Sequence, residues 1–70
     1  MRFQIIESRK RKLDYCIEGE SFENVFDNIA NIYDVEACNL KACCEIRRNI
    51  MRYVIFDGNN RIAILELVDN

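Results

Sequence analysis

Cysteine is the residue type in this sequence best suited to metal or redox chemistry. The four thiols belong to Cys16, Cys38, Cys43 and Cys44. Zinc needs ligands that converge at about 2.0–2.3 Å, whereas Cys38 and Cys44 would lie about 20 Å apart on a strand. Cys43 and Cys44 would point to opposite faces, and the sequence has no histidine to complete a mixed site. We therefore expect no metal site, with Cys38 and Cys44 as small core residues and Cys16 and Cys43 partly exposed.

Side chains that could carry out catalysis are scarce. The commonest general base is missing because histidine is absent, and Ser8 and Ser21 are the only side-chain alcohols besides tyrosine. The sequence has only two glycines, so it has no glycine-rich phosphate-binding loop. Acidic pairs such as Glu18 and Glu20 fall beside a strand end and a helix start, where acids need no catalytic explanation. We expect a protein that is not an enzyme and that uses no cofactor.

Positive charge is concentrated in two segments of the sequence, and this suggests nucleic-acid binding as one candidate function, the alternative to the protein-binding function considered below. The residues concerned are Arg9, Lys10, Arg11, Lys12, Arg47 and Arg48. The first four would lie at a hairpin tip, and such clusters contact phosphates in a salt-dependent way that ignores base sequence. A solvated turn is the favoured explanation of these residues, since no RNA-binding aromatic signature or zinc-finger spacing accompanies them. The net charge of −2 argues neither way.

The elements that must position these residues begin with a hairpin and a helix. Alternation of apolar and polar residues predicts strands over 2–7 and 13–18. Ser21 is a good helix N-cap, because its hydroxyl oxygen can accept a hydrogen bond from a free amide of the first turn. Apolar residues then recur at spacings of three and four, which places them on one helical face. They are Phe22, Val25, Phe26, Ile29 and Tyr33.

The second half of the chain predicts three more strands. Segment 37–47 contains helix-forming residues, but its apolar residues alternate as they do on a strand. Segments 50–56 and 61–68 flank Asp57-Gly58-Asn59-Asn60, which is typical of a hairpin turn. We therefore predict an α+β domain of order ββαβββ, an antiparallel five-stranded sheet with one helix packed on one face. The order of the strands in the sheet remains open.

One helix cannot cover both sides of such a sheet, yet the last two strands are apolar on both faces. If Arg48 and Asn49 form a two-residue turn, Met51, Tyr53 and Ile55 lie under the helix. The residues that then face outward form our predicted partner-binding surface: Ile50, Arg52, Val54, Phe56, Arg61, Leu65 and Leu67. Exposed apolar patches usually mark interfaces, and arginine is common in them. The alternatives are a different register, or a fold of segment 8–12 over this face.

Size and composition limit the remaining choices. Seventy residues form a single domain with a marginal core, which favours support from a partner such as a second copy. No stretch approaches the roughly 20 apolar residues of a membrane helix, and the first residues lack the order of a signal peptide. We expect a cytoplasmic protein with reduced thiols.

The order of elements resembles that of small proteins from phages and mobile elements. The resemblance extends to the amino-acid sequence of residues 15–23, YCIEGESFE, which connects the second strand to the helix. Among these proteins are certain anti-CRISPR proteins, in which a five-stranded sheet curls around one helix. The resemblance implies an inhibitor that docks on a larger protein or nucleoprotein and blocks its surface by steric occlusion. The alternatives are a nucleic-acid-binding protein and a homodimeric accessory protein.

Overall fold

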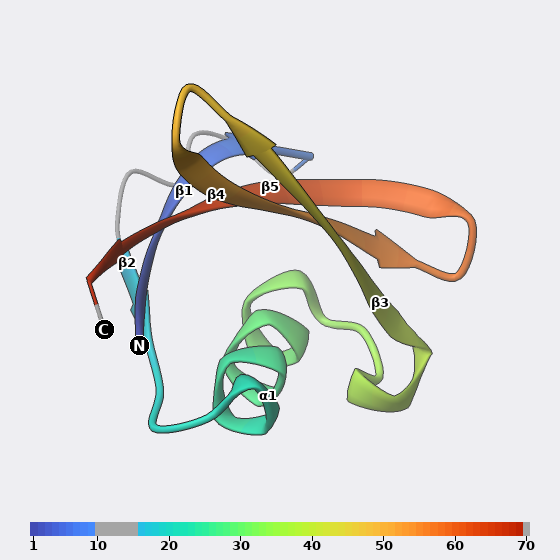
Figure 1. Ribbon diagram of the computed structural model, residues 1–70. Coiled ribbons are helices and arrows are strands. Elements are labelled where there is room, and N and C mark those ends of the chain that lie inside the picture. Colours follow the sequence, from blue (N-terminus) through green and yellow to red (C-terminus); the bar gives the residue numbers. More distant parts are fainter. Residues whose placement is uncertain (10–15, 70) are drawn as a thin grey trace.

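A five-stranded antiparallel sheet arches over a single helix (Figure 1). The computed structural model describes residues 1–9 and 16–69. Its elements are β1 (Arg2–Ser8), β2 (Cys16–Glu18), α1 (Phe22–Tyr33), a 3-10 turn (Ala37–Asn39), β3 (Leu40–Arg47), β4 (Ile50–Asp57) and β5 (Asn60–Asp69). The predicted α+β class and ββαβββ order are confirmed. No helix in the described part of the chain is long and apolar enough to cross a membrane.

The strand order is β2-β1-β5-β4-β3, with antiparallel pairs throughout. β1 therefore pairs with the last strand, β5, as well as with β2. This leaves β2 and β3 as the two edge strands. They differ in length, since β2 has 3 residues and β3 has 8.

The helix begins where the sequence predicts. Ser21 is the N-cap, and its Oγ accepts a hydrogen bond from the backbone nitrogen of Asn24 at 3.4 Å. Asp34 ends the helix in the left-handed conformation, with φ 56°. Val25, Ile29 and Tyr33 are buried against the sheet, whereas Phe22 and Phe26 lie partly buried at one side of it.

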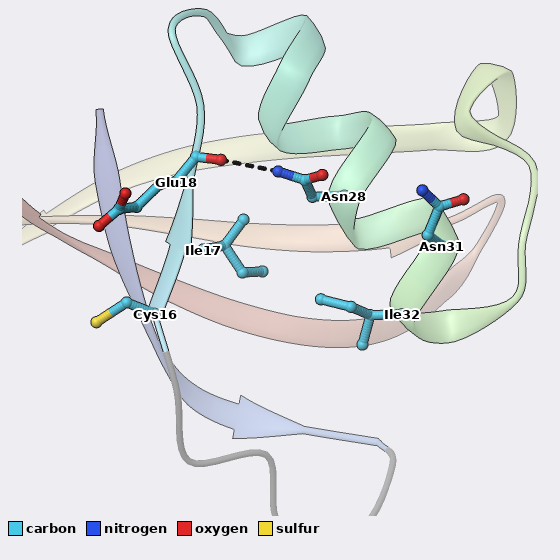
Figure 2. A pocket seen from close by; sticks show the side chains of 6 residues that line it. All are labelled: Cys16, Ile17, Glu18, Asn28, Asn31 and Ile32. Atoms are coloured by element: carbon cyan, nitrogen blue, oxygen red, sulfur yellow. Dashed lines mark hydrogen bonds between the residues drawn. The ribbon is translucent and has the colours of Figure 1, made fainter.

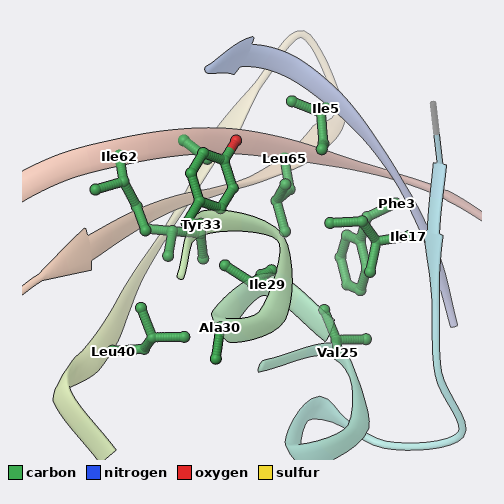
Figure 3. Packing of buried hydrophobic residues seen from close by; sticks show 12 residues of the cluster. Phe3, Ile5, Ile17, Val25, Ile29, Ala30, Tyr33, Leu40, Ile62 and Leu65 are labelled. Atoms are coloured by element: carbon green, nitrogen blue, oxygen red, sulfur yellow. The ribbon is translucent and has the colours of Figure 1, made fainter. Parts of the chain in front are cut away.

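The core lies between α1 and the concave face of the sheet (Figure 3). Its largest fully buried side chains come from β1, α1, β4 and β5: Phe3, Val25, Ile29, Ile55, Ile62 and Leu65. Phe3 meets Tyr53 edge to face, with ring centroids 5.4 Å apart. This apolar layer positions the strands whose other face is available for function.

The third strand begins later than predicted, because Ala37–Asn39 forms a 3-10 turn. Two predictions on cysteines were wrong. Cys38 is exposed on that turn, and Cys44 is exposed on the edge strand β3. The predicted turn at Arg48 and Asn49 is confirmed, with Arg47 opposite Ile50.

Candidate partner-binding surface

The face of the sheet turned away from α1, called the outer face below, is not covered by any described element (Figure 1). Side chains alternate along β4, and Tyr53 and Ile55 belong to the helix side. Four of the predicted contact residues therefore lie together on the outer face of this strand: Ile50, Arg52, Val54 and Phe56. Ile50 is exposed at one end, and the other three are partly buried.

Leu65 and Leu67 do not belong to this surface, and the prediction that they face outward was wrong. Leu65 is fully buried opposite Ile5 and Tyr53, and Leu67 packs against the same core. The cause is a β-bulge. Ile55 pairs with Ala63 and Phe56 pairs with Arg61, so Ile62 is an extra residue between Arg61 and Ala63. One extra residue exchanges the two faces of the strand beyond it.

The bulge brings Ile64 to the outer face, where sequence reasoning did not place it. Ile64 pairs with Val54 across the strands. It is only 8% exposed, yet it lies outside the main cluster of buried residues. Ile64, Val54 and Phe56 therefore form a separate apolar centre on the outer face.

Two ion pairs lie on either side of this centre. Arg52 Nε is 2.9 Å from Glu66 Oε2, and Arg61 Nη2 is 2.8 Å from Glu7 Oε1. The Arg52 and Glu66 side chains are 30% and 19% exposed, against 56% and 54% for Arg61 and Glu7. Water screens the second pair more strongly, so the first contributes more to the geometry of the face.

A second apolar feature, missed in the sequence, is an open groove of about 500 Å³ between α1 and the β3–β4 hairpin. It is lined by Phe22, Phe26, Leu40, Lys41, Ala42, Cys44 and Tyr53. Burial, together with the neighbouring Cys44, raises the pKa of Tyr53 above its ordinary value. The signal in the sequence is the i, i+4 spacing of Phe22 and Phe26, which places both residues on the same helical face.

A smaller hollow of about 270 Å³ lies between β2 and α1 (Figure 2). Asn28 Nδ2 donates a hydrogen bond to the Glu18 carbonyl oxygen at 2.8 Å, across its rim. The Cys16 thiol, also at the rim, donates to Gln4 Oε1 at 3.3 Å. These polar groups tie the short strand β2 to its neighbours.

Of the basic residues named for the alternative function, the structure describes Arg9, Arg47 and Arg48, and it places them in two separate regions. Arg9 follows β1, where its backbone nitrogen donates to the Ile62 carbonyl oxygen at 2.8 Å. Ile62 lies near the β4–β5 turn, whereas Arg47 and Arg48 lie at the β3–β4 turn, at the opposite end of β4. Lys10, Arg11 and Lys12 lie outside the described residues. Arg9 is therefore not joined to Arg47 and Arg48 in one surface.

The thiols and carboxylates offer no metal site within residues 1–9 and 16–69, where no group of three or more potential ligands gathers. Cys16, Cys38, Cys43 and Cys44 are all free thiols.

Comparison with known proteins adds no assignment, since no family model, curated protein or solved structure significantly matches the chain.

Proposed function

We propose that this chain is a protein-binding domain that acts by covering a surface of a larger protein or nucleoprotein. One observation carries the proposal: the partly exposed Val54 and Phe56 surround the buried Ile64 on a sheet face that no described element covers, and two ion pairs frame this apolar centre. Protein interfaces have this anatomy, with an apolar middle and a polar rim.

The energetics favour a small number of strong contacts. Ile50 is 41% exposed, and Phe56 retains partial exposure on a face that contributes little to the main core. Full burial of an exposed side chain of this size contributes about 1.5–3 kcal/mol, and completing the partial burial of Ile50 or Phe56 supplies only part of that. Arg52 and Arg61 are already paired with carboxylates, so a partner meets a face whose charges are locally balanced.

The resemblance to small phage inhibitors gives this binding a consequence, namely inhibition by steric occlusion. A domain that acts in this way needs no catalytic groups, and it acts in equimolar amounts with its target. The four free thiols suit the reducing cytoplasm, where we propose that the chain works.

The test compares the wild-type chain with a variant of the outer face. The double variant Val54→Thr/Phe56→Thr removes apolar surface and keeps the strand, because threonine is β-branched and is favoured in strands. Met51→Thr is the matched control, because Met51 lies on the same strand, is 38% exposed and faces the helix side. Each chain is immobilised in turn, and the proteins retained from a bacterial extract are quantified by mass spectrometry.

A partner of the outer face is retained by the wild type and by Met51→Thr and is lost with the double variant. The activity of the purified partner should then fall linearly as this protein is added, and the fall should end when the two are present in equimolar amounts. Equal retention by a double variant with a wild-type circular dichroism spectrum would contradict the proposed surface. Inhibition at strongly substoichiometric amounts would contradict occlusion and indicate catalysis.

A further inference from the structure

The strand β3 presents a long, regular, unpaired edge. It is the last strand of the sheet, and its pairing with β4 continues over Leu40–Arg47 without a register shift. Proteins usually protect an edge with a short strand, a bulge, proline or charged side chains. The opposite edge, β2, has such protection because it is only 3 residues long. β3 has no bulge or proline, and its charged side chains Lys41, Glu45 and Arg47 are of both signs, so its edge admits a strand of complementary charge.

The hairpin turn determines which residues offer those groups. Arg48 and Asn49 have φ of 53° and 66°, as in a type I′ turn. The flanking pair, Arg47 with Ile50, then occupies a hydrogen-bonded position. Because such positions alternate along an antiparallel ladder, the odd-numbered residues of β3 bond to β4. The even-numbered residues from Ala42 to Ile46 direct their backbone N–H and C=O groups to the free edge, whereas the Leu40 N–H already donates to the Ala37 carbonyl oxygen.

The side chains of β3 are complementary to a second, antiparallel copy of the same strand. When Cys43 stands opposite Cys43 of the second copy, Lys41 stands opposite that copy's Glu45, and the reverse pair forms by symmetry. Ala42 and Cys44 then form hydrogen-bonded pairs across the two chains. Ile46, which is 67% exposed in the single chain, comes opposite Leu40. Opposite charges and paired apolar residues each stabilise an antiparallel pair of strands.

The two neighbouring registers lack this complementarity. With Ala42 opposite itself, Lys41 stands opposite Cys43 and Glu45 opposite Asn39 of the second copy, so no opposite charges are paired. With Cys44 opposite itself, Lys41 stands opposite Arg47 of the second copy, and like charges in that position are destabilising. Lys41 makes no ion pair with any described residue, so it is available to Glu45 of another chain. Glu45 makes a 3.7 Å contact with the exposed Arg47 and stands opposite Arg52, which is itself paired with Glu66. Charge therefore selects the register centred on Cys43.

We propose that two copies of this chain join through their β3 edges, in the register centred on Cys43, to form one continuous antiparallel sheet. The two-fold axis runs perpendicular to the sheet at Cys43, so both outer faces lie on the same side. This self-association uses the edge of the sheet and leaves Val54, Phe56 and Ile64 uncovered. It does not depend on the proposed partner-binding function.

The test is a charge exchange followed by light scattering coupled to size exclusion, with reductant and at low salt. Wild type should be a dimer. Lys41→Glu places carboxylates opposite each other twice in each dimer and should weaken association roughly tenfold or more. Glu45→Lys should do the same with ammonium groups, and the double exchange Lys41→Glu/Glu45→Lys should restore the dimer. Circular dichroism shows whether each variant is folded.

Thiol crosslinking measures the register independently of the charges. A chain that keeps Cys43, with Cys16, Cys38 and Cys44 changed to serine, should form a disulfide-linked dimer under mild oxidation. A chain that keeps only Cys44 should not, because Cys44 faces Ala42 of the second copy. A monomeric wild type, a dimer strengthened by Lys41→Glu, failure of the charge exchange to restore association, or preferential crosslinking through Cys44 would each overturn the proposal.

Discussion

The hydroxyl oxygens of Ser8 and Tyr33 lie 2.6 Å apart and join the end of β1 to the last turn of α1. Tyr33 is 3% exposed, and its ring packs in the core shown in Figure 3. A buried tyrosine usually finds a partner for its hydroxyl, and here Ser8 is one. This contact fixes where the helix lies along the sheet.

Loss of this hydrogen bond should lower the stability of the fold. We expect Tyr33→Phe and Ser8→Ala each to reduce the free energy of unfolding by about 0.5–1.5 kcal/mol. Urea denaturation followed by circular dichroism measures both. The double variant should cost less than the sum of the single ones, because the two hydroxyls share one interaction. Additive losses would show that the contact contributes nothing.

Gly19 is required because the chain passes close to the start of the helix. A Cβ at this position would lie 2.8 Å from Asn24 Cβ and 3.0 Å from the Val25 nitrogen. Both atoms are fixed by the first turn of α1, so Gly19→Ala should destabilise the fold by about 1–3 kcal/mol.

Gly58→Ala is the control for Gly19→Ala, since it has open space around its Cβ position and is strained only by φ of +61°. That strain costs about 1–2 kcal/mol. Thermal unfolding of the two variants, and of Gly19→Ala combined with Asn24→Gly, separates the causes. Removal of the Asn24 side chain should recover part of the loss at Gly19 beyond the cost of the new glycine, and no recovery would contradict the steric explanation.

Leu65 distinguishes the sequence prediction from the structure. A leucine on an uncovered outer face would tolerate Leu65→Ala with little change in stability. In the structure Leu65 is fully buried between β1 and β4, so the substitution should lower the free energy of unfolding by about 2–5 kcal/mol. Urea denaturation measures the loss. A change below about 0.5 kcal/mol would contradict the register that the bulge imposes.

The sequence predicted those features that local chemistry determines. The Ser21 cap, the apolar face of α1 and the two-residue turn at Arg48 and Asn49 each depend on a few neighbouring residues. The outer-face position of Val54 and Phe56 followed from that turn, since alternation continues unbroken along β4.

The remaining features depend on contacts between distant residues. The bulge beside Ile62 carries no distinctive residue, yet it exchanges the faces of β5 and puts Ile64 where Leu65 was expected. The exposure of Cys44 goes with its position on the edge strand β3, beside an open groove next to α1, which periodicity does not reveal. Strand order was also undetermined, because either outer strand of the last three satisfies the same alternation as a neighbour for β1.

The pair of Arg52 and Glu66 allows folding and partner binding to be measured separately. Arg52→Glu places two carboxylates opposite each other where the side chains are only partly exposed, so it should cost about 1–3 kcal/mol of stability. The exchange Arg52→Glu/Glu66→Arg should recover much of that loss, because it restores an ion pair at the same two positions, although the carboxylate at position 52 still faces Glu45 of β3. Urea denaturation measures both variants. The exchange also reverses the charges that a partner meets on the outer face, so partner affinity should fall although stability returns. If the exchanged chain bound its partner as tightly as the wild type, the outer face around Arg52 would not be the contact surface.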